Sequence, residues 1–385
     1  MNPNPDKPLL VNRAHAYWSW RMRQALPLLL ICCIPWSPPG SSAPRAAGAA
    51  GDPSARADRL LAGMTLQQKI GQMVMAPADS VLATGRLGGA ILFGPDVVSP
   101  GQGHARIAAL QQSQAIPLLV AADQEGGDTS TMSSADVPAE LSEAQYGAIG
   151  STGRVYQDAL TTGRALRALG VNIDLAPVLD VLTNPRSPMA SRSYGSDPAR
   201  VTALGLAAMR GYHDAGIAAT AKHFLGLGAS DSDAHVTLPT DTRTLPQLES
   251  AELVPMRAAI RAGVDALMVT HVALPALDPS GTPASLSRPI VTGFIRARLG
   301  YQGVIITDSL AMGGLGPHIA SIQVAAVHAI EAGDDMVLIA ADVPTIRITL
   351  TALDEAAFAG RIPLSAINAS VRRILILKAR LGLLH

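Results

Sequence analysis

The chain has 385 residues, with 30 basic and 30 acidic side chains, so its formal net charge is zero. This balance gives no reason to expect a nucleic-acid or polyanion partner. The length suits one large α/β domain or two ordinary ones.

Residues 1–51 are typical of an export signal followed by a low-complexity linker. Arg13, Arg21 and Arg23 precede the apolar segment at 25–36, which is too short to span a bilayer as a free-standing helix. A segment rich in Pro, Gly, Ser and Ala follows, with a plausible cleavage site at 47–49. We therefore expect a secreted or cell-surface protein with no stable membrane span. The alternative is a disordered tail with a chance apolar segment.

Both cysteines lie inside that apolar segment, at Cys32 and Cys33. The processed chain would then have no cysteine and no disulfide, although it is exported. A lipoprotein signal also ends its apolar core in cysteine, but it usually has a small residue just before it. Ile31 stands there, and lipid anchoring is therefore kept as an alternative.

From residue 52 onward, short apolar segments alternate with longer helical ones. The segments are continuously apolar, as expected of strands that are buried on both faces. The eight predicted strands are 71–76, 88–93, 117–123, 172–178, 217–224, 265–272, 303–309 and 335–342. Helical patterns fill the intervals, for example at 103–114, 200–216 and 248–263, and a closing amphipathic helix is expected at 364–385.

Eight strand–helix units predict a single-domain α/β fold, a (β/α)₈ barrel of the TIM type spanning residues 52–385. A doubly wound open sheet is the alternative. The near-equal units, and the absence of a Gly-rich phosphate loop after the first strand, favour the closed barrel.

Polar side chains follow several of the predicted strands, at the barrel end where active sites lie. Any one of them alone suits a structural, hydrogen-bonded role, but together they suit recognition of a hydroxyl-rich ligand. They are Asp123, Asp174, Asp180, Lys222, His223, His271 and Asp308.

The sequence has no signature of a metal or cofactor site. His223 and His235 are twelve residues apart, with no third ligand at a useful spacing. A G-x-S-x-G elbow, a Walker loop and a dinucleotide-binding glycine motif are also missing. Acid/base chemistry and nucleophilic carboxylate chemistry remain.

Six segments occur in the order seen in family 3 glycoside hydrolases, and the chain most resembles their single-domain bacterial β-N-acetylglucosaminidases. The resemblance covers roughly residues 60–384. Its segments are NIDLAPVLDV, RSYGSDP, KHFLGLG, DSDAH, PASLS and ITDSLAMGG.

The resemblance implies a role for seven residues. Asp308 resembles the catalytic nucleophile that forms a glycosyl-enzyme intermediate. Asp233 and His235 match the Asp–His dyad of this branch, with His235 as general acid/base. The remaining positions match residues that bind the sugar, namely Asp123, Arg192, Lys222 and His223.

The function implied is an exported retaining glycosidase with no cofactor, acting as a monomer on small N-acetylglucosaminides. Muropeptides from peptidoglycan recycling and chitooligosaccharides are the candidate substrates. A β-glucosidase, a phosphorylase in which phosphate replaces water, and a secreted sugar-binding pseudoenzyme are the alternatives.

The sequence departs from the family pattern at two places. Family members usually have arginines at the positions of Asp128 and Thr131, and the second arginine normally contacts the sugar. They also usually have Pro and His where this chain has Leu225 and Leu227. Catalysis is expected, but with altered substrate affinity or preference.

Overall fold

The computed structural model describes residues 52–132, 136–316 and 319–384. The expected export signal, its two cysteines and the linker lie outside the described residues.

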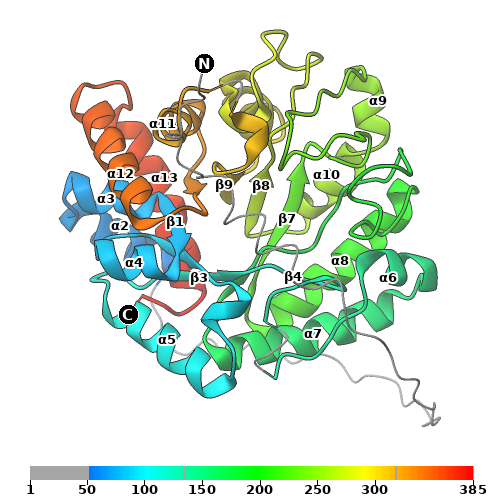
Figure 1. Cartoon of the computed structure of the whole chain (residues 1–385), viewed down its shortest axis with the longest axis horizontal. Coiled ribbons are helices and arrows are strands. Elements are labelled where there is room, and N and C mark those ends of the chain that lie inside the picture. Colours follow the sequence, from blue (N-terminus) through cyan, green and yellow to red (C-terminus); the bar gives the residue numbers. More distant parts are fainter. Residues whose placement is uncertain (1–51, 133–135, 317–318, 385) are drawn as a thin grey trace, which may run out of the picture. The chain divides into compact units, whose positions relative to one another are not determined.

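Eight parallel strands form a closed barrel (Figure 1), which confirms the predicted fold and shows that the open-sheet alternative is wrong. All eight predicted strands are present: β1 (Val74–Pro77), β2 (Gly89–Ile91), β3 (Leu119–Ala122), β6 (Ile173–Asp174), β7 (Ala218–Phe224), β8 (Ala266–Val269), β9 (Val304–Ser309) and β10 (Met336–Leu338). Their order around the barrel is β1-β10-β9-β8-β7-β6-β3-β2. The barrel closes between β1 and β10, where Val74 pairs with Val337 and Met75 with Leu338.

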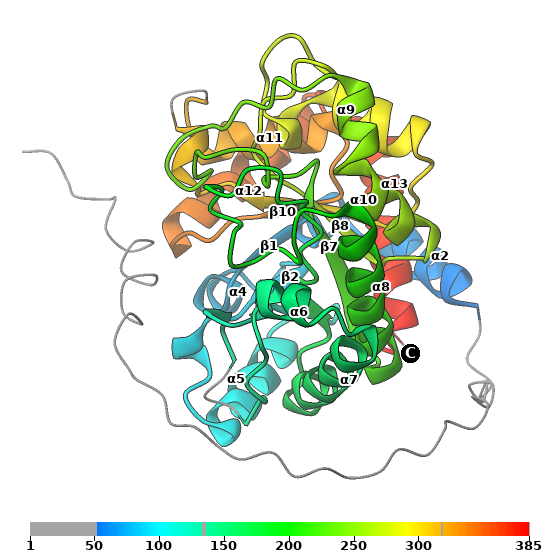
Figure 2. The ribbon, with the colours of Figure 1, turned by 90° about the vertical axis from the view of Figure 1, so that its right-hand side faces the viewer.

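Helices cover the outside of the barrel (Figure 2). The longer ones are α2 (Pro53–Gly63), α5 (Pro100–Gln112), α7 (Thr152–Leu169), α8 (Pro198–Ala215), α10 (Leu253–Arg261), α11 (Ile322–Ala332), α12 (Val343–Phe358) and α13 (Leu364–Arg380). Shorter segments are α3 (Leu66–Gln72), α4 (Ala78–Thr84), α6 (Glu143–Ile149), α9 (Leu245–Ser250), the single turns η1 (Gly94–Asp96), η2 (Ala284–Leu286) and η4 (Gly313–Leu315), and the π-helical η3 (Pro289–Arg298).

The predicted helix at 248–263 is wrong in one respect, because the structure has two helices there. Helix α9 ends before Ala251, whose φ of −124° and ψ of −95° leave the helical region. Helix α10 then begins at Leu253. The apolar periodicity continues through this break, so the sequence pattern does not reveal it.

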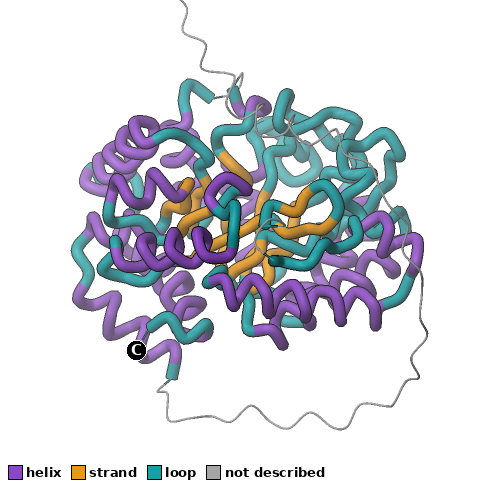
Figure 3. The backbone as a smooth tube through the Cα atoms, turned by 60° about the horizontal axis from the view of Figure 1, so that its bottom comes forward, coloured by secondary structure: helices purple, strands orange, loops and turns teal. Residues whose placement is uncertain are grey.

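The strands lie inside a ring of helices (Figure 3), and this burial explains their composition. All seven residues of β7 are buried, including Lys222 and His223 at its carboxyl end. Parallel strands covered on both faces need apolar side chains on both. A buried charge at the end of such a strand requires a partner, and the site described below supplies one.

The last helix packs beside the first described helix, as Figure 2 shows for α13 and α2. The Arg372 guanidinium lies 2.6 Å from Asp58 Oδ1 across this contact. Arg56 donates to the Leu384 carbonyl at 2.9 Å. Both ends of the described domain are therefore fixed to each other on the outside of the barrel.

A two-stranded hairpin follows β3 and was not predicted. It consists of β4 (Gln124–Gly126) and β5 (Thr129–Ser130), which pair antiparallel. Among the helices of the described residues, none is long and apolar enough to cross a membrane.

Candidate active site

Asp308 lies at the carboxyl end of β9, where two hydrogen bonds fix its carboxylate. The Thr270 hydroxyl donates to Oδ2 at 3.0 Å, and the Ser309 backbone N–H donates to Oδ1 at 2.8 Å. A carboxylate oxygen can accept two hydrogen bonds. The direction of the group is therefore set while each oxygen keeps a lone pair for chemistry.

Three histidines lie near Asp308 and control its charge. Burial alone would raise the pKa of this carboxyl, but its electrostatic interactions with His223, His271 and His235 outweigh burial and lower the pKa to about 2. Asp308 is therefore ionised at neutral pH. An ionised carboxylate is the form that acts as a nucleophile.

His271 holds the residue that follows Asp308. Its Nε2 lies 3.0 Å from the Ser309 carbonyl, and its Nδ1 lies 2.7 Å from the Ser285 hydroxyl. A carbonyl only accepts, so Nε2 donates to it and Nδ1 accepts from Ser285 in the neutral ring. Burial lowers the pKa of His271, which favours this neutral form.

Asp233 and His235 lie together on the loop between β7 and α9, on the solvent side of the site. Asp233 Oδ1 accepts from both the backbone N–H and the ring Nδ1 of His235, at 2.9 and 2.8 Å. Partial burial alone would raise the pKa of Asp233, but the two hydrogen bonds outweigh burial and lower the pKa. An ionised Asp233 fixes the proton on Nδ1, so Nε2 is the nitrogen that can exchange a proton with a ligand.

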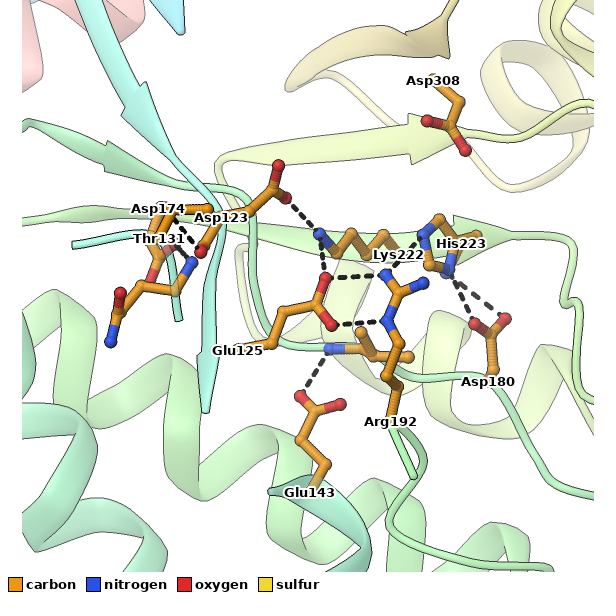
Figure 4. Close-up of polar contacts among 12 residues, drawn as sticks. Asp123, Glu125, Thr131, Glu143, Asp174, Asp180, Arg192, Lys222, His223 and Asp308 are labelled. Carbon is orange, nitrogen blue, oxygen red and sulfur yellow. Dashed lines mark hydrogen bonds and ion pairs between the residues drawn. The ribbon is translucent and has the colours of Figure 1, made fainter. Parts of the chain in front are cut away.

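Lys222 is buried at the end of β7 between two carboxylates (Figure 4). Its Nζ lies 2.6 Å from Asp123 Oδ1 and 2.6 Å from Glu125 Oε1. Burial would lower the pKa of this lysine, but the two anions outweigh burial and raise it. Lys222 therefore remains an ammonium group inside the barrel mouth.

Arg192 forms a bidentate ion pair with the same buried glutamate. Its Nε and Nη2 lie 2.6 and 2.7 Å from the two oxygens of Glu125 (Figure 4). Burial would raise the pKa of Glu125, but Arg192 and Lys222 outweigh burial and lower it to about 2. Glu125 is thus an anion that joins two cations, one at the end of β7 and one on the segment between β6 and α8.

His223 is oriented by a buried aspartate. Its Nδ1 lies 2.7 Å from Asp180 Oδ2, while Asp180 Oδ1 accepts from the Leu227 backbone at 2.9 Å. Its Nε2 is 3.5 Å from Arg192 Nη2. The acceptor-only carboxylate fixes a proton on Nδ1, which turns Nε2 toward the polar side of the site.

Asp174, expected at the rim, is fully buried and holds the backbone at the start of the hairpin. Its Oδ1 accepts from the Gln124 backbone at 3.1 Å, and burial raises its pKa well above the ordinary value. Glu143 behaves in the same way. It accepts from the Val178 backbone at 2.8 Å, and burial again raises its pKa well above the ordinary value.

The hairpin shows what stands in place of the family arginines. The backbone N–H and hydroxyl of Thr131 both donate to the Asp123 carbonyl, at 3.1 and 2.8 Å. Asp128 lies at the turn and is exposed. Leu225 and Leu227 are buried and apolar. None of these four side chains supplies the charged fork that an arginine would offer to a sugar.

The structure brings all seven predicted site residues to one end of the barrel, and it adds two that the sequence reasoning missed. Glu125 was passed over although it lies two residues after Asp123 in a segment already singled out. Thr270 precedes His271 at the end of β8, so its position at a strand end was the available signal. In the described part of the chain, no group of three or more His, Cys, Asp or Glu side chains is arranged to hold a metal ion.

Comparison with known proteins gives concordant matches. The glycosyl hydrolase family 3 N-terminal domain matches residues 65–377. A beta-hexosaminidase from Pseudomonas aeruginosa is 32% identical over 284 residues, which are 74% of this chain and 84% of that protein. Beta-hexosaminidase A from Pseudoalteromonas piscicida is 31% identical over 77% of this chain, which spans only 54% of that relative.

A solved structure matches over the same region. The family 3 beta-N-acetylglucosaminidase from Paenibacillus sp. str. FPU-7 is 39% identical, with a TM-score of 0.80, over 83% of this chain and 63% of that one. The resemblance inferred from the sequence is confirmed, and the chain belongs to glycosyl hydrolase family 3.

Proposed function

We propose that this barrel is a retaining glycoside hydrolase that removes terminal β-linked N-acetylglucosamine from chitin-derived or cell-wall fragments. The observation that carries the proposal is that an ionised Asp308, half-buried at the end of β9, lies at the same end of the barrel as a histidine whose Nδ1 is held by Asp233. A retaining glycosidase needs a nucleophile on one side of the anomeric carbon and a proton donor on the other. The names of the relatives support this choice of reaction.

In the first step, an Asp308 oxygen attacks the anomeric carbon and the glycosidic bond breaks. The leaving oxygen takes the proton from His235 Nε2, and Asp233 stabilises the charge of the protonated ring. In the second step, water loses a proton to His235 and its oxygen displaces Asp308 from the anomeric carbon. Both residues return to their starting protonation states.

Lys222, Arg192, His223 and Asp123 are proposed to bind the sugar hydroxyls. Lys222 and Arg192 are fixed by Glu125, and His223 is fixed by Asp180. Because these side chains are already held in position, little rotamer freedom is lost when the sugar binds. A neutral sugar suits a cluster in which cations and anions are already paired.

A phosphorylase is the second candidate, and the observation that favours it is the histidine at the acid/base position. Phosphate carries negative charge, and a histidine repels it less than a carboxylate would. Phosphate would then take the place of water in the second step. The product would be a sugar 1-phosphate.

One assay separates these candidates. Purified protein is given an aryl β-N-acetylglucosaminide and the matching β-glucoside, each with and without inorganic phosphate. We expect phosphate-independent release of N-acetylglucosamine. A phosphate-dependent sugar 1-phosphate would establish the phosphorylase, preference for the β-glucoside would establish the glucosidase, and binding without turnover would indicate a pseudoenzyme.

We also propose that residues 1–51 direct export and that the folded protein is a monomer. N-terminal sequencing of protein recovered outside the cytoplasm tests the first proposal, and an unprocessed chain found inside the cell would contradict it. Light scattering at assay concentration tests the second.

A further inference from the structure

The loop that bears Asp233 and His235 is fastened to the segment that follows Asp308. The Gly313 N–H donates to the His235 carbonyl at 2.9 Å, and the Gly314 N–H donates to the Ala234 carbonyl at 3.1 Å. These are backbone contacts between two loops that follow different strands, β7 and β9. They join the proton donor to the strand of the nucleophile.

Both contacts require glycine, because the two backbones approach too closely for a side chain. A Cβ on Gly313 would lie 2.6 Å from the His235 carbonyl oxygen. A Cβ on Gly314 would lie 2.4 Å from the Ala234 oxygen and 2.9 Å from the Thr237 oxygen. All three atoms belong to the backbone and cannot rotate away, so any side chain would push the loop off.

The segment that presents the glycines is itself held at Asp308. Gly313 follows Asp308 by five residues. The Leu310 N–H donates to the Leu338 carbonyl of β10 at 2.9 Å, and the Met312 N–H donates to the Ser309 carbonyl at 3.0 Å. The glycine pair is thus part of the same framework as the nucleophile.

The rest of the dyad loop is anchored away from its tip. At its start, the Asn184 N–H donates to the Gly228 carbonyl at 2.9 Å, and at its end the Asp241 N–H donates to the Ala273 carbonyl at 2.9 Å. The Asp233–His235 tip lies between these anchors. The backbone of the tip accepts from Gly313 and Gly314.

We infer that Gly313 and Gly314 are positioning residues, which set the acid/base histidine against the nucleophile by holding the tip of the dyad loop. The inference rests on the proposed function and adds to it a residue pair that touches neither substrate nor the reacting atoms. If the pair is blocked, proton donation should be impaired while nucleophilic attack is preserved.

The test uses leaving groups of different basicity. A dinitrophenyl β-N-acetylglucosaminide needs little protonation, whereas chitobiose needs a proton on the leaving oxygen. We expect Gly313→Ala and Gly314→Ala each to lower kcat/KM for chitobiose by about 10- to 100-fold and to change that for the dinitrophenyl substrate by less than about threefold. The matched control is Gly153→Ala, because no atom lies within 4 Å of the Cβ it would add.

A double-variant cycle shows whether the effect passes through the histidine. If the glycines act by placing His235, then Gly313→Ala should cause little further loss in a His235→Ala background. Equal loss of kcat/KM on both substrates, or full additivity with His235→Ala, would overturn the inference.

A measurement on the unaltered protein covers the case in which the glycine variants do not fold. Hydrogen exchange followed by mass spectrometry should show slow exchange of the Gly313 and Gly314 amides, since both are donors. Exchange at the rate of an unprotected amide would overturn the inference. If the unaltered protein turns over no N-acetylglucosaminide, the proposed function fails, and the exchange result still decides whether the glycines hold the loop.

Discussion

Lys222 and Glu125 face each other inside the barrel mouth, with Nζ 2.6 Å from Oε1 and both side chains 2% exposed. Arg192 pairs with the same glutamate from the other side. One anion therefore keeps in place the two cations that we propose bind the sugar. Removing its charge would leave Lys222 and Arg192 without the anion that both of them contact.

The first prediction concerns that glutamate. Glu125→Gln should lower the free energy of unfolding by about 3–5 kcal/mol, because breaking a buried ion pair leaves uncompensated charge. It should also lower kcat/KM. Thermal and urea unfolding measure the first effect. The matched control is Glu249→Gln, a half-exposed glutamate that pairs with Arg257 and Arg298, which should cost less than about 1 kcal/mol. Equal losses in the two variants would contradict this account.

The second prediction concerns the nucleophile. Asp308→Asn removes the attacking charge while retaining the shape, so kcat should fall by several orders of magnitude with little change in unfolding temperature. A slow 2-fluoro sugar should label Asp308, which peptide mass spectrometry can locate. Labelling of another residue would refute the assignment.

The third prediction concerns the dyad. His235→Ala should impair substrates with poor leaving groups most, and Asp233→Ala should produce the same pattern more mildly, because it only disturbs the ring. Steady-state kinetics across a series of aryl substrates measures the slope. An equal loss on all members of the series would show that His235 binds substrate or supports structure instead.

The fourth prediction concerns the hairpin after β3. Thr131→Arg would restore a charge-assisted hydrogen bond, worth roughly 1.5–3 kcal/mol, and should raise kcat/KM on N-acetylglucosaminides about 10- to 100-fold. Asp128→Asn should change little, because Asp128 is exposed at the turn. A fall in kcat/KM for Thr131→Arg would mean that the loop is built around a different sugar.

The fifth prediction concerns Lys378, which is fully buried in α13 with the Gln72 amide oxygen 2.5 Å from its Nζ. Burial lowers its pKa from 10.5 to about 7. The unfolded chain then binds more protons than the folded one between these two values, so folded stability should rise as pH rises from about 7 to 10.5.

Lys378→Met should raise the unfolding temperature at pH 7 and remove this part of the pH dependence. The control is Lys69→Met, because Lys69 is half-exposed in the neighbouring helix α3. This variant should keep the pH dependence of stability. Unfolding temperatures measured from pH 6 to 10 provide the check. A pH dependence that is unchanged in Lys378→Met would show that another group titrates.

The strands could be predicted because parallel strands buried on both faces are apolar throughout. Their lengths were harder to predict. The predicted strand at 172–178 shortens to Ile173–Asp174 in the regular ladder. Beyond it Pro177 has no N–H to donate, and the contact with β7 continues as an isolated bridge between Val178 and Lys222. Composition does not distinguish a regular strand from such a bridge.

From position in the fold alone, the site could be predicted where a polar side chain ends a strand, whereas Asp233, His235 and Arg192 were expected only because their segments resemble those of the family. Asp308, Lys222 and His223 satisfy that rule. Glu125 does not, because it lies in the hairpin after β3, and its ion pair with Lys222 of β7 exists only in the folded chain. The close approach at Gly313 is invisible to sequence for the same reason, since it is a contact with a loop about 80 residues away.

The pairing of β1 with β10 has a consequence for how the protein is made. About 260 residues separate the two strands, and ribosomes add roughly 5–20 residues per second. One edge of β1 therefore stays unpaired for roughly 10–50 seconds, until β10 has been synthesised. During that interval an apolar strand edge is open to pairing with other chains. Chaperones that cover this edge should therefore determine how much protein is recovered, whatever the stability of the finished barrel.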